Sequence, residues 1–320
     1  MNPLFRRSAL VGVAAAVSLA WASSSEARVT RIIIDTTASL SGQDIPYQTL
    51  TGRAFGELDP NDPHNAIITD IALAPSTNGK VEYIASFLIV KPVDMLQSSG
   101  LMWHDVPNRG GRITITSDLR NSHDVGLSSG WQGDNASATA VPANASSLAP
   151  VTPSSNEWVK TPVLSGVTGR ILGRIINRSG TNQPLNVMGN PIPYFPADSA
   201  NNSGAELKEH LKETLTGVVT EGPTIPNGDW KFCYGAGATF AVPGLPTSLP
   251  ARVCLDSTKG SFDPAKLYQL TYTVKDPYVL GAGTAAFRDV ASFFKYGVVD
   301  DFGTANPLAG RIRWAIIRGS

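Results

Sequence analysis

Short runs of β-branched and aromatic residues, separated by turn residues, make up most of this chain and restrict it to a fold rich in strands. Glycine and proline number 30 and 23 among the 320 residues, well above their average combined usage of about 12%. The strand period is clearest near residue 270, where four apolar side chains share one face: Tyr268, Leu270, Tyr272 and Val274. A chain of this kind is expected to contain many turns and is not expected to form a helical bundle.

One segment has a helical period, and it stands near the carboxyl end of the chain. Residues 283–296 carry apolar side chains at spacings of three and four, which places them on one stripe: Ala286, Phe287, Val290, Phe293 and Phe294. Gly297 is positioned to end this helix. The run 311–317 follows and reads as a largely buried strand. Strand, loop, helix and strand in this order predict an α/β sheet.

Residues 1–27 have the features of a secretory signal peptide. Arg6 and Arg7 precede an uncharged apolar run, and small residues after it offer a cleavage site. An uncleaved anchor is the alternative, although the run is short compared with the roughly 20 residues of a spanning helix. No later segment is apolar for long enough to cross a bilayer. We therefore expect an exported protein, periplasmic or extracellular, with no stable membrane span once the signal is removed.

Charge and cysteine content narrow the possible partners. The 26 basic and 26 acidic residues cancel, which argues against a nucleic-acid partner because such proteins carry a basic surface. The only two cysteines are Cys233 and Cys254. In an exported protein this pair favours a disulfide bond over two buried free thiols.

The composition divides the mature chain into four parts. Residues 28–134 are strand-rich, and residues 135–156 contain no charged side chain and predict a flexible loop. Residues 157–275 predict a second strand-rich section, inserted before the helix and final strand of residues 276–320.

Six stretches carry a resemblance to a family of exported proteins with an α/β-hydrolase domain. They are TGRAFGELDP (51–60), VEYIASFLIVKPVD (81–94), PNRGG (107–111), SGWQGD (129–134), FDPAKLYQLTYTVKDP (262–277) and DPYVLGAGTAAFRDVASFFKY (276–296). The resemblance spans most of the mature chain apart from the uncharged loop. It implies an α/β fold: an incomplete α/β-hydrolase sheet with a β-rich N-terminal part and a strand-rich insert.

The resemblance also implies where an active site forms. It places residues 101–106 in an early parallel strand, so that the following turn takes the place of the oxyanion loop: Asn108, Arg109, Gly110 and Gly111. Without the resemblance, the two glycines indicate a simple turn. It places a substrate pocket after the neighbouring strand, at residues Trp131, Gln132, Gly133 and Asp134.

The nucleophile of such an enzyme is a serine on a sharp turn between a strand and a helix, followed along the chain by an acid and a histidine. In the family that the chain resembles, the sequence of this turn is similar to Gly-x-Ser-Gln-Ser-Gly. This chain ends at Arg318-Gly319-Ser320, and Gly319 would be the first glycine of that pattern. The resemblance therefore implies an N-terminal fragment of a serine esterase, inactive by itself, with its triad beyond Ser320. Ser320 becomes the nucleophile itself only if Arg318 replaces the first small residue of the turn.

No cofactor or metal is expected, because the histidines lack ligand spacing with cysteine or carboxylate partners. These are His64, His104, His123 and His210, and none is assigned as a catalytic base. The expected partner is a small-molecule or polymer ester. The alternative function is a non-catalytic, exported polysaccharide- or surface-binding protein, or a pseudoenzyme. It depends on exposed aromatic residues in the insert: Trp230, Tyr234 and Phe240.

Overall fold

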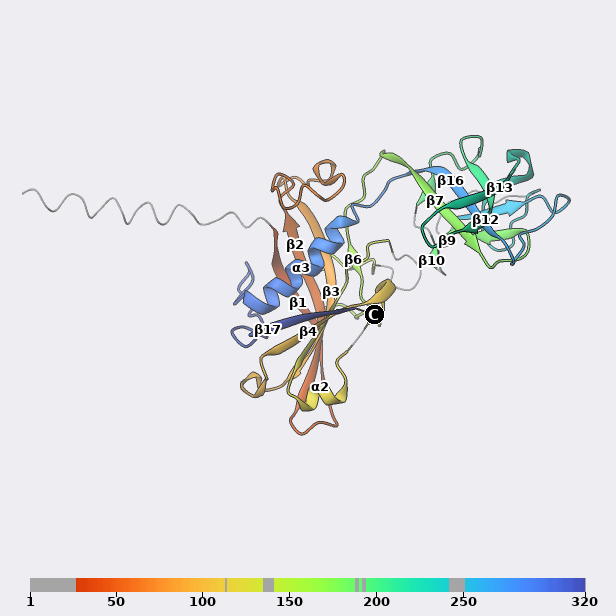
Figure 1. Ribbon diagram of the computed structural model, residues 1–320. Coiled ribbons are helices and arrows are strands. Elements are labelled where there is room, and N and C mark those ends of the chain that lie inside the picture. Colours follow the sequence, from red (N-terminus) through yellow and green to blue (C-terminus); the bar gives the residue numbers. More distant parts are fainter. Residues whose placement is uncertain are drawn as a thin grey trace, which may run out of the picture.

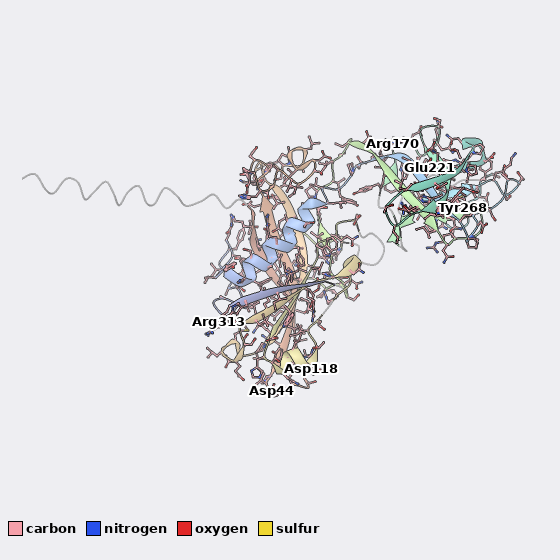
Figure 2. All side chains as sticks on the ribbon, in the orientation of Figure 1. Asp44, Asp118, Arg170, Glu221, Tyr268 and Arg313 are labelled. Atoms are coloured by element: carbon pink, nitrogen blue, oxygen red, sulfur yellow. A yellow bond between two sulfur atoms is a disulfide. The ribbon has the colours of Figure 1, made fainter. Side chains whose placement is uncertain are left out.

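The computed structural model describes residues 27–112, 114–134, 141–187, 190–191, 194–241 and 251–319 (Figure 1). The predicted signal up to residue 26, the first part of the predicted flexible loop (135–140) and Ser320 lie outside these residues. The described chain forms two lobes, a large-sheet lobe (27–161 and 280–319) and an insert lobe (168–275), joined by residues 162–167 and 276–279, of which Leu164 and Val279 pack in the large-sheet core. Figure 2 shows the division with side chains, with Asp44, Asp118 and Arg313 in the first lobe and Arg170, Glu221 and Tyr268 in the second.

The large-sheet lobe contains a seven-stranded mixed sheet in the order β1-β2-β3-β5-β4-β17, with β6 also paired to β3. Its strands are β1 (Ala27–Leu40), β2 (Tyr47–Leu58), β3 (Val81–Pro92), β4 (Leu101–Val106), β5 (Val125–Ser129), β6 (Val159–Lys160) and β17 (Trp314–Gly319). The first three strands pair antiparallel, and β3 pairs antiparallel with β5 and β6. Strand β4 lies between β5 and β17 and is parallel to both. The expectation of a parallel strand at residues 101–106 is thus confirmed.

Helix α3 (Gly281–Tyr296) covers one face of this sheet (Figure 1). Ala286, Val290, Phe293 and Phe294 of the predicted stripe are all buried, and the Phe294 ring meets the ring of Phe87 edge-on at 4.9 Å. Each large apolar side chain buried in this way contributes roughly 1.5–3 kcal/mol. The predicted helix is confirmed, and the sequence pattern alone was enough to locate it.

The opposite face of the sheet carries a buried charge. Arg53 on β2 is 1% exposed, and its guanidinium donates to both carboxylate oxygens of Asp35, at 2.8 and 2.9 Å. It also donates to the carbonyls of Ala145, Ser147 and Ala149 at 2.7, 2.6 and 2.9 Å. Arg53 therefore fastens the uncharged segment, over its described residues 141–156, onto the sheet.

A second buried acid lies at the end of that segment. Glu157 accepts from Arg112 at 2.6 Å and from the Ser86 hydroxyl at 2.5 Å, while the Trp158 amide donates to the same hydroxyl at 2.8 Å. Burial raises the pKa of Glu157, and the charge of Arg112 partly offsets that rise. Residues 112 and 157, which lie 45 apart in the chain, are thereby held together over β3.

The insert lobe contains a five-stranded, a three-stranded and a two-stranded sheet, and the five- and three-stranded sheets supply one shared core. The predicted alternation along β16 is confirmed, because Tyr268, Leu270, Tyr272 and Val274 are all buried. A disulfide bond joins Cys233 to Cys254, as the cysteine content predicts. The strands are β7 (Thr168–Ile176), β8 (Asn182–Pro184), β9 (Asn186–Val187), β10 (Asn190–Pro191), β11 (Phe195–Pro196), β12 (Glu206–Glu213), β13 (Val219–Ile225), β14 (Trp230–Tyr234), β15 (Ala251–Leu255) and β16 (Leu267–Lys275).

The insert lobe is entered and left through two adjacent chain segments. The Leu164 amide donates to the Pro277 carbonyl at 2.9 Å, and the Asp276 amide donates to the Val167 carbonyl at 2.9 Å. Elsewhere the connections carry short helices only: η1 (Ile71–Leu73), η2 (Met95–Gln97), η3 (Asn108–Gly110), α2 (Ser117–Asn121) and η4 (Asn227–Asp229).

The prediction of an α/β fold with an incomplete α/β-hydrolase sheet is wrong. The structure is 41% strand and 12% helix, with several mixed and antiparallel sheets, and α2 and α3 are its only α-helices among the described residues. An α/β-hydrolase carries helices on both faces of its sheet. Here α3 covers one face, whereas the segment held by Arg53 lies on the other. The prediction gave too much weight to one helix and the strand after it.

We expect removal of the Arg53 side chain to destabilise the large-sheet lobe strongly. Arg53→Ala leaves Asp35 buried without its partner, and breaking a buried pair in this way costs about 3–5 kcal/mol. Urea unfolding monitored by tryptophan fluorescence measures this loss. Lys80→Ala is the matched control, since it removes a partly exposed ion pair with Asp59 at 2.6 Å and is expected to cost about 1 kcal/mol or less. Equal losses for the two variants would contradict the role given to Arg53.

Candidate functional site

The carboxyl ends of the three parallel strands meet at one edge of the large sheet. Asp105 on β4 is in register with Ser128 on β5, and Val106 is in register with Gly319 on β17. Loops that leave parallel strands at this edge lie close together, which is where open sheets of parallel strands hold their ligands. We refer to residues 107–111, 131–134 and 319 as the strand-end site.

The turn after β4 contains the predicted oxyanion residues. Asn108 and Arg109 open a single 3-10 turn, Gly110 adopts a φ of +74°, and Gly111 follows at a φ of −59°. The amide of Gly111 donates to the Asn108 carbonyl at 3.0 Å. The Gly111 amide therefore already has an acceptor within the turn. Of the two glycine amides, only that of Gly110 stays a candidate donor to an oxyanion.

The loop after β5 is tied to this turn by Trp131. Its indole N–H donates to the Pro107 carbonyl at 2.7 Å, so two loops that the sequence predicted separately are in contact. The backbone of Trp131 also lies against α3, because a Cβ added to Gly283 would come within 2.1 Å of the Trp131 carbonyl oxygen. Trp131 therefore connects the loop after β5 to the loop after β4 and to α3. The sequence did not indicate this role.

The other three residues of the predicted pocket are half-buried and point to different neighbours. Gly133 lies against the Thr161 side chain. Asp134 lies close enough to Tyr194 and Tyr278 for its charge to raise the pKa of both phenols, although burial is the larger cause in each case. Gln132 directly precedes Gly133 in the chain. These residues are close to the strand ends, and Asp134 faces the insert lobe.

An ion pair that the sequence did not predict anchors the end of β17. Arg318 donates to both carboxylate oxygens of Asp105, at 2.6 and 3.1 Å, and its guanidinium lies 5.4 Å from the centre of the Trp103 ring. Asp105 is 1% exposed. In the sequence, this ion pair was indicated only by the charged residues Asp105 and Arg318, each of which stands in an otherwise largely apolar strand. The pair fixes the backbone that leads into Gly319.

The expectation of a buried strand over residues 311–317 is wrong. Strand β17 begins at Trp314, and Trp314, Ile316 and Ile317 are 59%, 41% and 66% exposed. The reason is its position: β4 pairs with one edge of β17, and no strand among the described residues pairs with the other. Gly319 is the last residue of β17. Ser320, where the elbow was predicted to begin, lies outside the described residues.

His104 is the histidine nearest to the strand ends, and its surroundings are those of a structural residue. Its Nε2 lies 2.9 Å from the Ser129 hydroxyl, and its ring stacks on Phe287 with the ring centres 3.7 Å apart. Burial lowers the pKa of His104 to about 3. The ring is therefore neutral at neutral pH and holds β4 to β5. The His64 and His123 rings instead lie 3.0 Å from Asp62 and Asp44, respectively.

The three aromatic residues on which the alternative function depended differ in exposure, and only Trp230 is buried. Trp230 is fully buried, with its ring 5.3 Å from that of Phe232 inside the insert core. Tyr234 is 37% exposed, and Phe240 lies under the Lys231 ammonium at 4.6 Å. Alternation along β14 places Trp230 and Phe232 on the inner face.

Neither a metal site, nor a membrane-spanning helix, nor a known relative points to a function for the described part of the chain. No group of three or more His, Cys, Asp or Glu residues capable of holding a metal ion occurs among the described residues. In the same part of the chain, every helix is too short or too polar to cross a membrane. Neither the sequence, compared with protein-family models and with curated proteins, nor the structure, compared with solved structures, finds a match.

We expect Gly110→Ala to lose stability that Gly111→Ala retains. A side chain at the +74° φ of Gly110 costs about 1–2 kcal/mol. At Gly111, φ is ordinary and a Cβ meets only the Asn108 carbonyl oxygen, at 3.3 Å. The free energy of unfolding in urea, measured for both variants, checks the difference. Equal values would mean that the turn does not require the left-handed conformation at residue 110.

We expect His104 to make the protein less stable as the pH falls below about 6.5. The unfolded residue takes up a proton near its ordinary pKa of 6.5, whereas the folded residue stays neutral down to about pH 3. The unfolded state then binds more protons, and the free energy of unfolding falls by about 1.4 kcal/mol per pH unit across that window. His104→Asn is expected to reduce this slope between pH 6 and pH 4, measured by urea unfolding.

A second measurement keeps this prediction independent of how well the variant folds. The ring protons of His104, assigned by their loss in the variant spectrum, are expected to keep a constant NMR shift between pH 7 and pH 5. A titration of these protons within that range would show that the folded residue accepts a proton.

Proposed function

We propose that this chain contributes part of the active site of an exported serine hydrolase that cleaves an ester or a related acyl bond. The observation that carries the proposal is the convergence of the Gly110 turn, Trp131 and Gly319 at the carboxyl ends of β4, β5 and β17. The resemblance of six sequence stretches to exported hydrolase-domain proteins supports the same function. Residues 1–27 and the Cys233–Cys254 disulfide support export.

Ester cleavage requires two groups at the strand-end site, a serine nucleophile and a hydrogen-bond donor to the oxyanion. A serine hydroxyl must be presented at a strand end so that its oxygen bonds to the acyl carbon while a histidine takes its proton. The former carbonyl oxygen then becomes negatively charged and needs a donor fixed in advance. The amide of Gly110 is the candidate donor, and one such donor contributes roughly 3 kcal/mol to the transition state. The proton next passes to the leaving alcohol, and water later releases the acyl group.

In this proposal the serine follows Gly319 in a longer protein, and the acid and histidine follow the serine. The Arg318–Asp105 pair holds the backbone from which such a turn would start. His104 is not the base, because its ring is buried and bonded to Ser129. The expected substrate is a small-molecule or polymer ester.

A fluorophosphonate probe, which reacts covalently with activated serines, tests the proposal. We expect the 320-residue chain to remain unlabelled and to be inactive toward p-nitrophenyl esters. A longer chain, extended by the codons that follow Ser320, is expected to be labelled on a serine within that extension and to turn over these esters. Labelling of a serine in the 320-residue chain, or a stop codon directly after Ser320, would contradict the proposal.

A further inference from the structure

A cavity of about 410 Å³ opens on the face of the large sheet opposite to α3. Its floor is formed by Phe55 on β2 and Ile84 on β3, whose neighbours in each strand point into the core beneath α3. Leu148, from the segment held by Arg53, and Phe302, from the loop after α3, form its walls. Its volume lies within the range of about 300–1,000 Å³ typical of small-molecule sites.

Two positively charged side chains line this cavity, Arg31 on β1 and Lys160 on β6. Among the described residues, neither has a carboxylate partner within the 4.0 Å that defines an ion pair. The Lys160 ammonium donates to the Ser146 hydroxyl at 3.0 Å. A lysine can donate three hydrogen bonds, so this contact leaves donor capacity on its nitrogen.

Arg31 is held in a way that favours recognition of an anion. Its guanidinium lies over the Phe302 ring with its carbon 3.3 Å from the ring centre. Stacking occupies one face of the planar group, while the N–H groups at its edge remain in position for a bidentate contact with a carboxylate. The aromatic ring thus sets the plane of the cation and widens the apolar wall beside it.

The two acids that line the cavity, by contrast, have other partners. Glu57 pairs with Arg28 at 3.4 Å. Glu82 accepts from the Ser76 hydroxyl at 3.2 Å and from the Asn78 amide at 3.4 Å. Arg28 therefore offsets the charge of Glu57, and the carboxylate of Glu82, although still charged, has hydrogen bonds to Ser76 and Asn78. Among the described residues, the lining then has two cations without an acidic partner against one acid without a basic partner.

We propose that this cavity binds a small aromatic carboxylate. The flat apolar body lies between Phe55, Ile84 and Leu148, and the carboxylate receives hydrogen bonds from Arg31 and Lys160. The charge complementarity selects an anion, and the aromatic and aliphatic walls select a flat hydrophobic body. The proposal goes beyond acyl hydrolysis, because it uses none of the residues of the strand-end site and needs no nucleophile.

Three probes of one shape and different charge test the proposal on the full chain by isothermal titration calorimetry in a buffer free of carboxylate and phosphate. They are 2-naphthoate, 2-naphthylmethanol and 2-naphthylmethylammonium. We expect 2-naphthoate to bind at least tenfold more tightly than the neutral alcohol, and the cationic amine to bind more weakly than either. Equal affinity for the three, tighter binding of the amine, or no binding of naphthoate would overturn the proposal.

Variants locate the site. Lys160→Gln and Arg31→Gln are each expected to weaken naphthoate binding about five- to tenfold and to leave binding of the alcohol unchanged, because only the charge-assisted contacts are lost. Leu148 is 63% exposed, so Leu148→Trp fits at the surface and is expected to fill the cavity and abolish binding of both probes. Arg313→Gln is the matched control, since Arg313 precedes β17 and does not line the cavity (Figure 2). Its naphthoate affinity is expected to stay within twofold of the parent, and an equal loss in Arg313→Gln and Lys160→Gln would place the binding elsewhere.

Discussion

The buried guanidinium of Arg53 determines how the large sheet is closed on the face away from α3. A sheet face left open to water exposes apolar side chains, and most two-layer domains cover it with a helix or another sheet. Here an irregular segment provides the cover, and an irregular segment brings backbone carbonyls that need donors. Arg53 supplies those donors to three of them, while Asp35 neutralises its charge. An uncharged stretch that looks featureless in sequence can therefore pack on the sheet.

A short series of contacts connects the strand-end site to the sheet face away from α3. The segment held by Arg53 continues to Glu157, which binds Arg112 directly after the glycine turn. On the side of α3, Trp131 and Gly283 bring the loop after β5 against the helix. The turn at Gly110 is thus supported from both faces of the sheet. Asp105 and Arg318 add a third support, which fixes the end of β17 relative to β4.

Local periodicity predicted the elements of this protein better than their assembly. The stripe in α3 and the alternation in β16 were readable because each reports which side of one element is buried. The number of layers over a sheet is instead set by contacts between distant residues, such as Arg53 with Ala145 and Ser147. Nothing near Arg53 in sequence marks it as the residue that holds a cover in place, so the fold class was predicted wrongly.

The candidate site was predictable only where it depends on the position of a strand in the sequence. The glycine turn and Trp131 follow strands that the sequence locates, and parallel pairing then brings them together. The contact between the Trp131 indole and Pro107, the Asp105–Arg318 pair and the cavity beside Arg31 all depend on side-chain directions across strands. The exposure of β17 also depended on its place at the edge of the sheet, which an apolar run cannot reveal.

The hydrogen bonds between Leu164 and Pro277 and between Val167 and Asp276 make the junction of the two lobes resemble the stem of a closed loop. Chain that leaves and returns through such a stem can be exchanged or shortened without moving the strands on either side of it. The sheets of the insert lobe are therefore free to change in size and surface chemistry while the edge formed by β4, β5 and β17 keeps its shape. A gene encoding this architecture can change the strands between residues 168 and 275 while it keeps the stem and the large-sheet core residues Leu164 and Val279.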